Sequence, residues 1–293
     1  MSIHAVDWVD AFTSQPMGGN GCAVVHDAAA LDAATCIRFV RETSLVECTF
    51  LEPSDVADVK VRYFLASHEI PFAGHPTVAT AASLYHRGIL TGPMMTFETG
   101  AGIIPVELTE GEGGPVFTMT QAKPEFGPTA SPEEVADVMG LGAADIVGTP
   151  QLVSTGLGFF ITVVKSMAAM KAAKLDVDAL RAFGAKHGVP DGTMLEPYLV
   201  TLEGAKAGDT FARLLMAPPS PPEDPFTGSA TGAAAAYLWH HGHLEGPRYV
   251  AEQGHLMERP GQADVEVLGP REAPEGVRVC GQTHVLMSGD LRL

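Results

Sequence analysis

Apolar and polar residues alternate along two short segments, each followed by a loop with the same pattern of proline, phenylalanine and glycine. Residues 59–65 read VKVRYFL and residues 210–216 read TFARLLM, and a period of two predicts β-strands with one buried face. Beyond each loop, residues 77–86 and 231–241 contain neither proline nor Asp, Glu, Lys or Arg. These stretches are apolar on nearly all sides, which predicts helices buried at the centre of a sheet.

The loop itself occurs twice. Residues 71–82 read PFAGHPTVATAA and residues 225–236 read PFTGSATGAAAA, at an offset of 154 residues, and Glu69 aligns with Glu223 upstream. A duplication predicts two similar domains, whereas a local coincidence is the alternative. Two similar domains would offer equivalent loops to a shared cleft, which is a common position for a small-molecule site.

The rest of the pattern predicts short strands separated by turns, with a few surface helices. The proline-rich stretch 123–132 is the best linker, so we place one half at 1–121, completed by the returning strand 281–293, and the other at 122–280. Gly88 and Gly242 are the expected stop signals of the two buried helices. Further strands are expected over 4–12, 21–26, 45–51, 95–98, 102–108, 116–120, 159–164 and 198–202, and further helices over 33–43, 132–139 and 176–187.

Composition narrows the classes of function. A chain of 293 residues that is 46% hydrophobic suits two domains of ordinary size. Its net charge of -17 opposes binding to nucleic acid and to anionic membranes. No apolar run reaches the ~18 residues of a membrane helix, and the first residues lack a signal core. We therefore expect a soluble, cytoplasmic protein.

The four cysteines, Cys22, Cys36, Cys48 and Cys280, have no zinc-site spacing, and no dinucleotide or phosphate-loop motif occurs. We expect free, mostly buried thiols and an activity that needs neither metal nor cofactor. A small anionic substrate would need local compensation for the acidic surface, for which helix N-termini are suited.

Glu47 is the first candidate for chemistry, because the segment LVECTFL around it contains no other charge. Burial of a carboxyl group raises its pKa by disfavouring the charged form, and a group that titrates near neutrality can both take and return a proton. The alternative is a glutamate on an edge strand that faces water.

The two loops supply the other candidates. His75 follows Gly74 at the predicted start of a helix, where backbone N–H groups lack partners. Gly228 and Ser229 occupy the same places in the second loop, directly after Asp224-Pro225, and Ser229 could cap that helix. Two such helix N-termini could hold a carboxylate without Lys or Arg. Ordinary capping and a structural histidine are the alternatives.

Asn20 lies in the turn sequence GGNGCA, which turn formation alone would explain.

Seven segments together resemble the phenazine-biosynthesis PhzF-like family. The resemblance spans nearly the whole chain, and the two glycine loops are its most specific part. It is carried by Val6–Asp7 with Ala11–Thr13, by Gly19–Asn20, Leu45–Phe50, Arg62–Phe64 with His68–Thr77, Glu223–Ala230, Arg259–Pro260 and the ending 281–293.

The resemblance implies an α+β, diaminopimelate epimerase-like fold, with two pseudo-symmetric domains that each wrap a curved, mostly antiparallel sheet around a central helix. It also implies a homodimeric isomerase or epimerase that moves a proton between carbons, or at one carbon, of a small carboxylate-bearing metabolite. Glu47 would be the acid/base, and His75 and Asp224 would assist it. The substrate would be bound by Asn20, Gly74, Gly228 and Ser229.

The sequence also departs from the family pattern. Val46 replaces a serine, Cys48 a threonine and Phe226 an alanine. These changes keep Glu47 but leave the substrate open. Related racemases use two cysteines where this chain has His75 and Ser229, so a two-thiol mechanism is not expected. A non-catalytic binder that kept the fold, or a structural homodimer module with a vestigial cleft, are the alternatives.

Overall fold

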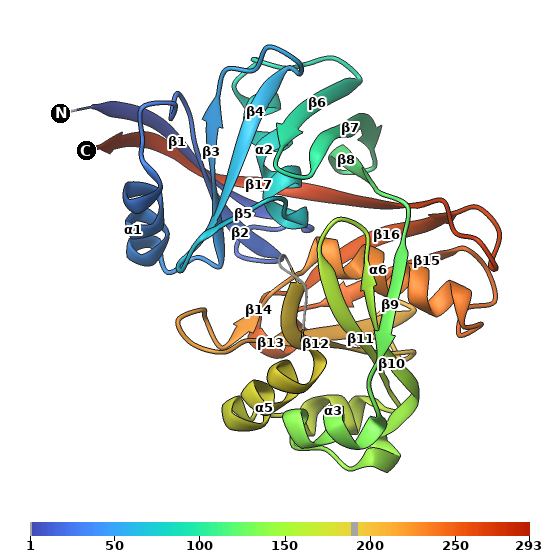
Figure 1. Ribbon diagram of the computed structural model, residues 1–293. Coiled ribbons are helices and arrows are strands. Elements are labelled where there is room, and N and C mark those ends of the chain that lie inside the picture. The colour runs from blue at the N-terminus through green and yellow to red at the C-terminus, as the bar shows by residue number, and fades with distance from the viewer. Residues whose placement is uncertain (1, 189–192) are drawn as a thin grey trace. The chain divides into compact units, whose positions relative to one another are not determined.

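The chain folds into two units that are not continuous in sequence. The computed structural model describes residues 2–188 and 193–293 (Figure 1). The first unit comprises Met1–Thr120, Pro219–Pro221 and Cys280–Leu293, and the second comprises Gln121–Pro218 and Pro222–Val279. These units are defined by compactness. The domain boundaries that we expect from the sequence, near residue 122 and at residue 281, stay a prediction.

The first unit is built mainly of strands around one buried helix. Its helices are α1 (Ala33–Thr43) and α2 (Gly74–His86). Its strands are β1 (Ile3–Ala11), β2 (Asn20–Val25), β3 (Glu47–Glu52), β4 (Val59–Leu65), β5 (Glu69–Ile70), β6 (Met94–Thr99), β7 (Gly102–Gly111), β8 (Gly114–Gln121) and the last strand of the chain, β17 (Gly276–Arg292).

Strand pairing closes the sheet of the first unit into a barrel. The pairs β1–β2, β3–β4, β6–β7 and β7–β8 are antiparallel, whereas β2–β3 and β4–β6 are parallel. The long β17 pairs with β8 and runs antiparallel to β1. The final strand therefore joins the two ends of the sheet formed by residues 3–121, as expected for the chain's return to its first half.

The second unit repeats the same order of pairing. Antiparallel β10–β11, parallel β11–β12, antiparallel β12–β13, parallel β13–β15 and antiparallel β15–β16 follow one another. Its strands are β9 (Glu125–Thr129), β10 (Ile146–Ser154), β11 (Gly158–Val164), β12 (Thr193–Thr201), β13 (Thr210–Leu215), β14 (Glu223–Asp224), β15 (Arg248–Gln253) and β16 (Gly261–Leu268). Its helices are α3 (Pro132–Met139), α4 (Met167–Ala172), α5 (Val177–His187) and α6 (Gly228–His240), with 3-10 turns at Ala143–Asp145 and His255–Met257.

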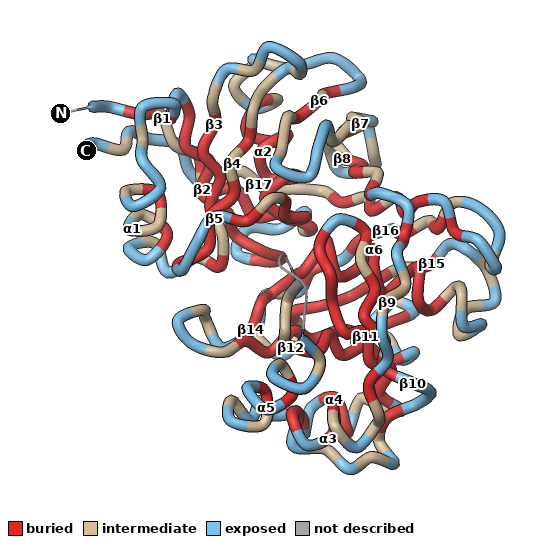
Figure 2. Tube along the Cα trace, in the orientation of Figure 1, coloured by how far each residue is buried: buried red, intermediate tan, exposed pale blue. Residues whose placement is uncertain are grey.

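The helices α2 and α6 are the buried centres that the sequence predicts. Every residue from Gly74 to Leu84, and every residue from Gly228 to Leu238, is buried (Figure 2). Both helices have 13 residues and start three residues earlier than expected, at the glycine of each loop. Because Pro76 then falls in the first turn, its missing N–H costs no intrahelical hydrogen bond.

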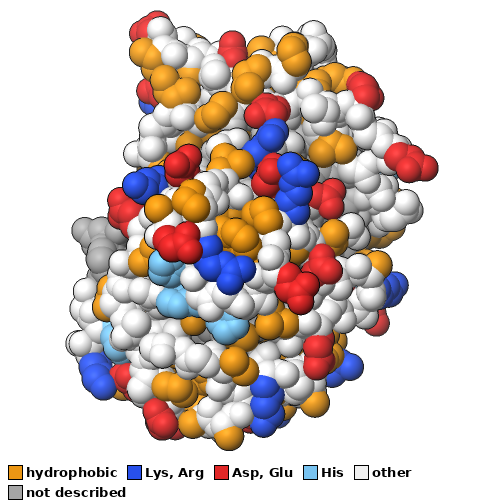
Figure 3. All heavy atoms as spheres, turned by 90° about the vertical axis from the view of Figure 1, so that its right-hand side faces the viewer, with side chains coloured by type: hydrophobic (Ala, Val, Ile, Leu, Met, Phe, Trp, Pro, Cys, Tyr) orange, Lys and Arg blue, Asp and Glu red, His pale blue; other side chains and the backbone are white. Residues whose placement is uncertain are grey.

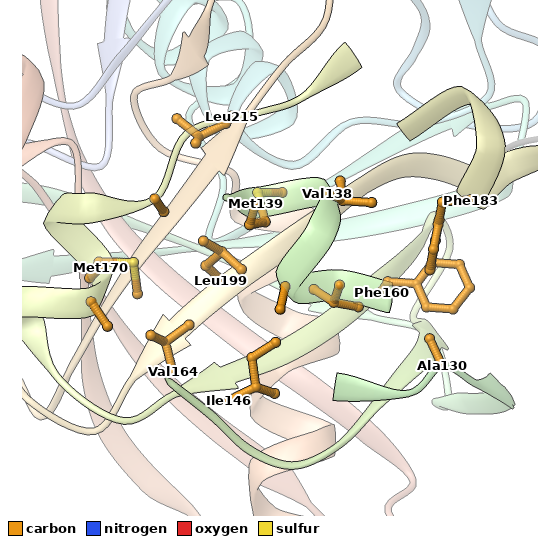
Figure 4. Close-up of a cluster of buried hydrophobic side chains, with 14 of the residues drawn as sticks. Ala130, Val138, Met139, Ile146, Phe160, Val164, Met170, Phe183, Leu199 and Leu215 are labelled. Carbon is orange, nitrogen blue, oxygen red and sulfur yellow. The ribbon is translucent and has the colours of Figure 1, made fainter. Parts of the chain in front are cut away.

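The outer face of each sheet is covered by separate helices. In the first unit, Cys36 and Val40 of α1 pack on Cys48 and Phe50 of β3. In the second unit, α3, α4 and α5 enclose a cluster that includes Phe160, Leu199 and Phe183 (Figure 4). Each sheet thus has a central helix on one face and surface helices on the other.

One expectation for the chain between the halves is wrong. Residues 123–132 were expected to form a linker, but Glu125–Thr129 form β9, which pairs antiparallel with β10. Pro124 and Pro128 do not prevent this, because Pro124 precedes the strand and Pro128 falls at the irregularity in its register with β10.

None of the helices that the structure describes is long and apolar enough to cross a membrane. On the face shown in Figure 3, acidic side chains lie scattered among basic and hydrophobic ones.

Candidate active site

Glu47 is the first residue of an interior strand. In β3 it lies opposite Cys22 of β2 on one side and Leu65 of β4 on the other, so the alternative of an edge strand is wrong. Two residues on, Thr49 is fully buried and shares a 2.9 Å hydrogen bond with Thr80 of α2. Side chains alternate along a strand, and Glu47 therefore lies on the face that carries α2. Its side chain is 13% exposed.

His75 and Asn20 meet Glu47 at the start of α2. The His75 side chain is 2% exposed, and its Nδ1 lies 3.0 Å from Nδ2 of Asn20 and 3.6 Å from Oε2 of Glu47. With the Asn20 amide as the donor, Nδ1 accepts, and the neutral ring carries its proton on Nε2. The distance to Glu47 exceeds a hydrogen bond but is short enough for strong electrostatic coupling. The first unit thus brings three of the predicted residues together.

The N-terminus of α2 lies at this cluster. Its N-cap residue, Ala73, has extended backbone and offers no side-chain acceptor to the first turn. Gly74 is buried directly before His75. Because the first N–H groups of a helix have no intrahelical acceptor, this end of α2 is suited to an anionic group.

Asp224, Gly228 and Ser229 lie together in the second unit, at the start of α6. Asp224 is 3% exposed, and its Oδ2 accepts a 2.5 Å hydrogen bond from Oγ1 of Thr227. Thr227 is the N-cap residue, and its side chain does not cap the helix. The proposed capping by Ser229 is wrong, because Ser229 is the second residue of the helix and lies past the cap position.

Gln253 fixes the loop from Asp224 to Thr227 and was not found from the sequence. Its Nε2 donates to the carbonyl of Asp224 at 2.8 Å, and its Oε1 accepts from the backbone N–H of Thr227 at 3.0 Å. The hydroxyl of Tyr198 donates to the same Oε1 at 3.1 Å. Gln253 is 1% exposed, and its polar atoms are thus used to hold the backbone around Asp224. The sequence EQG at the end of a strand carries no signal that separates such a glutamine from a surface one.

The first turn of α6 is held by a second buried amide. Nε2 of Gln121 donates to the carbonyl of Gly228 at 2.9 Å, while its Oε1 accepts from the hydroxyl of Thr155 at 2.5 Å. A Cβ at Gly232 would lie 2.0 Å from that Oε1. A side chain at position 232 would therefore displace the Gln121 amide from its present position.

The cysteines behave as the sequence predicts. All four are free; Cys22, Cys36 and Cys48 are buried, and Cys280 is half-buried. Burial raises the pKa of the Cys22 thiol, which lies next to Glu47 in the sheet, and raises that of Cys48 to about 12. Both thiols are therefore neutral near pH 7 and do not act as nucleophiles. Within residues 2–188 and 193–293, no group of three or more His, Cys, Asp or Glu side chains is arranged to hold a metal ion.

The comparison with known proteins gives one consistent family. The sequence matches the family described as phenazine biosynthesis-like protein (PhzC-PhzF) over residues 9–289. It is 32% identical over 283 residues to the trans-2,3-dihydro-3-hydroxyanthranilate isomerase of Pseudomonas chlororaphis, covering 95% of this chain and 96% of that protein. It is 31% identical over 274 residues to an isomerase of Bacillus subtilis, covering 88% of each chain.

The fold agrees with this assignment. The crystal structure of a PhzF-family phenazine biosynthesis protein from Bacillus anthracis covers 100% of both chains, with a TM-score of 0.85 and 27% identity. Together, the sequence match, the curated relatives named isomerases and the shared fold identify the chain. It belongs to the phenazine biosynthesis-like PhzF family and is an isomerase.

Proposed function

We propose that this isomerase moves a proton between two carbons, or at one carbon, of a small molecule that carries a carboxylate. The observation that carries the proposal is the cluster of Glu47, His75 and Asn20 at the N-terminus of a buried helix. A mostly buried carboxyl group next to an imidazole is a recurrent arrangement for proton transfer.

Glu47 takes the proton from carbon and returns it. His75 lies 3.6 Å from its carboxylate, so the imidazole can stabilise the charge that develops in the transition state. Asn20 holds the imidazole by its 3.0 Å contact with Nδ1. A fixed ring orientation matters, since a developing charge is stabilised best by groups that are already oriented.

The carboxylate of the substrate binds at helix N-termini. The surface is acidic, with a net charge of -17, so an anion needs a local source of positive potential. The first turns of α2 and α6 provide N–H groups at Gly74 and at Gly228. Ser229 adds a hydroxyl, and Asp224 serves as a second polar group that orients the substrate.

We further propose that both loops act on one substrate, within two pseudo-symmetric domains of the diaminopimelate epimerase-like fold. The support is the offset of 154 residues between the loops together with the matching order of strand pairs around α2 and α6. The two loops carry different residues at equivalent positions, His75 in the first and Ser229 in the second. This difference suits a reaction in which the two loops contact the substrate in different ways.

The relatives suggest which substrate to test first. Among them, the Pseudomonas chlororaphis protein is named for trans-2,3-dihydro-3-hydroxyanthranilate, a cyclic unsaturated carboxylate that we propose as the first compound to test. The departure at Cys48 does not argue against it, because that side chain packs toward α1, on the face of β3 opposite to Glu47.

The test is proton exchange in D2O. The enzyme is incubated with trans-2,3-dihydro-3-hydroxyanthranilate and with a panel of cyclic and amino-acid carboxylates, and C–H signals are followed by proton NMR. We expect deuterium in at least one compound, at one of its C–H positions. A compound that shifts the melting temperature but never incorporates deuterium would instead support the second candidate, a non-catalytic binder.

A further inference from the structure

A glycine lies directly on the proline that opens each of the two site loops. Gly100 follows β6, and a Cβ placed on it would be 2.8 Å from Cα of Pro71 and 3.1 Å from Cβ of Pro71. Gly254 follows β15, and a Cβ placed on it would be 2.6 Å from the carbonyl oxygen of Pro225. Cβ atoms essentially never approach other atoms this closely, so neither position accepts a side chain without movement.

The two contacts are related by the same duplication as the loops. Gly100 and Gly254 are 154 residues apart, as are Pro71 and Pro225. The strands that end at these glycines, β6 and β15, each run parallel to the strand before the loop, β4 and β13. Each unit therefore makes the contact with its own residues and at the same place in its sheet.

The need for glycine at position 100 comes from the contact itself. Gly100 has no positive φ, so its backbone does not require a glycine, whereas Gly254 has a φ of +82° and is also constrained by its conformation. Gly254 is further enclosed by the carbonyl of Arg259, 2.3 Å from the same Cβ position.

An ion pair holds each loop from its other end. Two residues before each proline, a glutamate accepts two hydrogen bonds from an arginine of the preceding strand: Arg62 to Glu69 at 2.9 and 2.8 Å, and Arg213 to Glu223 at 2.9 and 2.7 Å. Such paired bonds fix geometry as well as contributing energy. Each loop is thus fixed at its start by the ion pair, and its proline is in close contact with the glycine.

We propose that Gly100 and Gly254 are positioning residues for the two helix N-termini. Pro71 and Pro225 each lie three residues before the glycine that starts the buried helix. The contact keeps Pro71 in place and with it the N–H groups of Gly74 and His75; Pro225 and Gly228 are held in the same way. The consequence for catalysis rests on the proposed function, because it assumes that these N–H groups hold the substrate carboxylate.

The structural arm of the test needs no substrate. Amide hydrogen exchange is measured by mass spectrometry for Gly100→Ala and Gly254→Ala. Gly92→Ala and Gly246→Ala are matched controls, because their Cβ positions have no neighbour closer than 3.7 Å and no positive φ. We expect Gly100→Ala to accelerate exchange in residues 72–78 at least ~10-fold and not in 226–232, and Gly254→Ala to do the reverse, as for an overpacked contact. Exchange no faster than in the controls, or equally faster throughout the chain, overturns the proposal.

A rescue variant covers the case in which Gly100→Ala does not fold. Pro71→Gly removes the Cβ that lies 3.1 Å from the new methyl group and the ring that restrains the backbone, so that Cα, at 2.8 Å, can move away. The double variant should then fold again, or should show slower amide hydrogen exchange in residues 72–78 than Gly100→Ala. Failure of any recovery would show that the contact with Pro71 is not what excludes a side chain at position 100.

The functional arm separates positioning from simple loss of folded enzyme. With trans-2,3-dihydro-3-hydroxyanthranilate as the probe, both Ala variants should raise KM ~10-fold relative to their controls, since misplaced N–H groups bind the carboxylate less well. A fall in kcat with unchanged KM would indicate only a smaller active fraction and would contradict the positioning role. If the wild type does not convert the probe, the proposed function fails for this substrate. The amide hydrogen exchange data still test whether the two glycines position the loops.

Discussion

At the scale of single residues, the site depends on polar groups that are buried and already oriented. His75 is placed by the helix and held by Asn20 at 3.0 Å, with the Glu47 carboxylate 3.6 Å away. Asp224 is placed by Thr227 and by the backbone contacts of Gln253. In the proposed mechanism, such preorganisation avoids reorientation during proton transfer, which is the main way that a polar site lowers a barrier.

Replacing Gln253 by methionine tests the support of Asp224. Gln253→Met keeps the side-chain volume but removes the acceptor for Thr227 and the donor to Asp224, so we expect ~1–3 kcal/mol lower stability to urea and a turnover reduced at least ~10-fold. Gln262→Met, at an exposed position of β16, is the control. Turnover equal to that of the control would show that Asp224 needs no such support.

At the scale of elements, the buried helix α2 is anchored at the end opposite the site. The fully buried carboxylate of Asp7 in β1 accepts hydrogen bonds from the hydroxyl of Ser83 at 2.6 Å and from Arg87 at 2.5 and 2.7 Å. Burial alone would raise the pKa of Asp7, but the bonds from Arg87, Ser288 and Ser83 outweigh it and lower the pKa to about 2. The C-terminal end of α2 is thus anchored, and the N-terminal end is the one that we propose binds the substrate.

This anchor predicts a stability that depends on pH. Because the pKa of Asp7 is lower in the folded than in the unfolded chain, its contribution of ~2 kcal/mol is fully present above pH ~4 and is lost as the pH falls toward ~2. Asp7→Asn should cost ~2–3 kcal/mol at pH 7 and flatten the stability curve between these values. The exposed Asp178→Asn is the control, since its ion pair with Arg181 lies at the surface. The free energy of unfolding is measured by urea denaturation at a series of pH values. An equal decrease in Asp7→Asn and Asp178→Asn would contradict the role of Asp7 as an anchor.

The elements show what the sequence could and could not predict. The alternation of apolar and polar residues predicted β4 and β13 closely, and the absence of charged residues predicted α2 and α6. Both features can be read directly from the sequence, because strand periodicity and complete burial each restrict which residues occur. The strand β9 was missed since its prolines indicate a linker, and only its pairing with β10 makes it a strand. The two-residue strands β5 and β14 have no local pattern at all. The same limit applied at the site: Glu47 stood out as a lone charge in an apolar segment, whereas the role of Gln253 depends on contacts with residues 26 and 29 positions away.

At the scale of the whole molecule, duplication of sequence and of strand pairing is the main organising feature. We propose that the two duplicated loops serve one substrate. A double-mutant cycle tests this without assuming any geometry: His75→Ala in the first unit and Ser229→Ala in the second are compared with the double variant. For a shared substrate, kcat/KM effects should be non-additive by at least ~0.5 kcal/mol. Additive effects within error would mean that the two loops act independently.

The proposed mechanism also makes a prediction about metals. Every step is assigned to side chains and backbone N–H groups, so exhaustive chelation should leave turnover within about twofold of the untreated enzyme. The measurement compares the wash-in of deuterium before and after dialysis against EDTA. A loss of activity that added metal restores would require a different mechanism.

The most direct test of the account is the rate of deuterium wash-in for Glu47→Gln beside the wild type. The glutamine keeps the size and hydrogen bonding of the side chain but cannot accept a proton from carbon. Substrate should still bind, because the N–H groups of Gly74 and Gly228 are unchanged. We expect exchange at the substrate carbon to fall at least ~100-fold, the usual scale for a lost acid/base. Exchange at the wild-type rate would contradict the account and make Glu47 a structural residue, leaving His75 or Asp224 as the proton carrier.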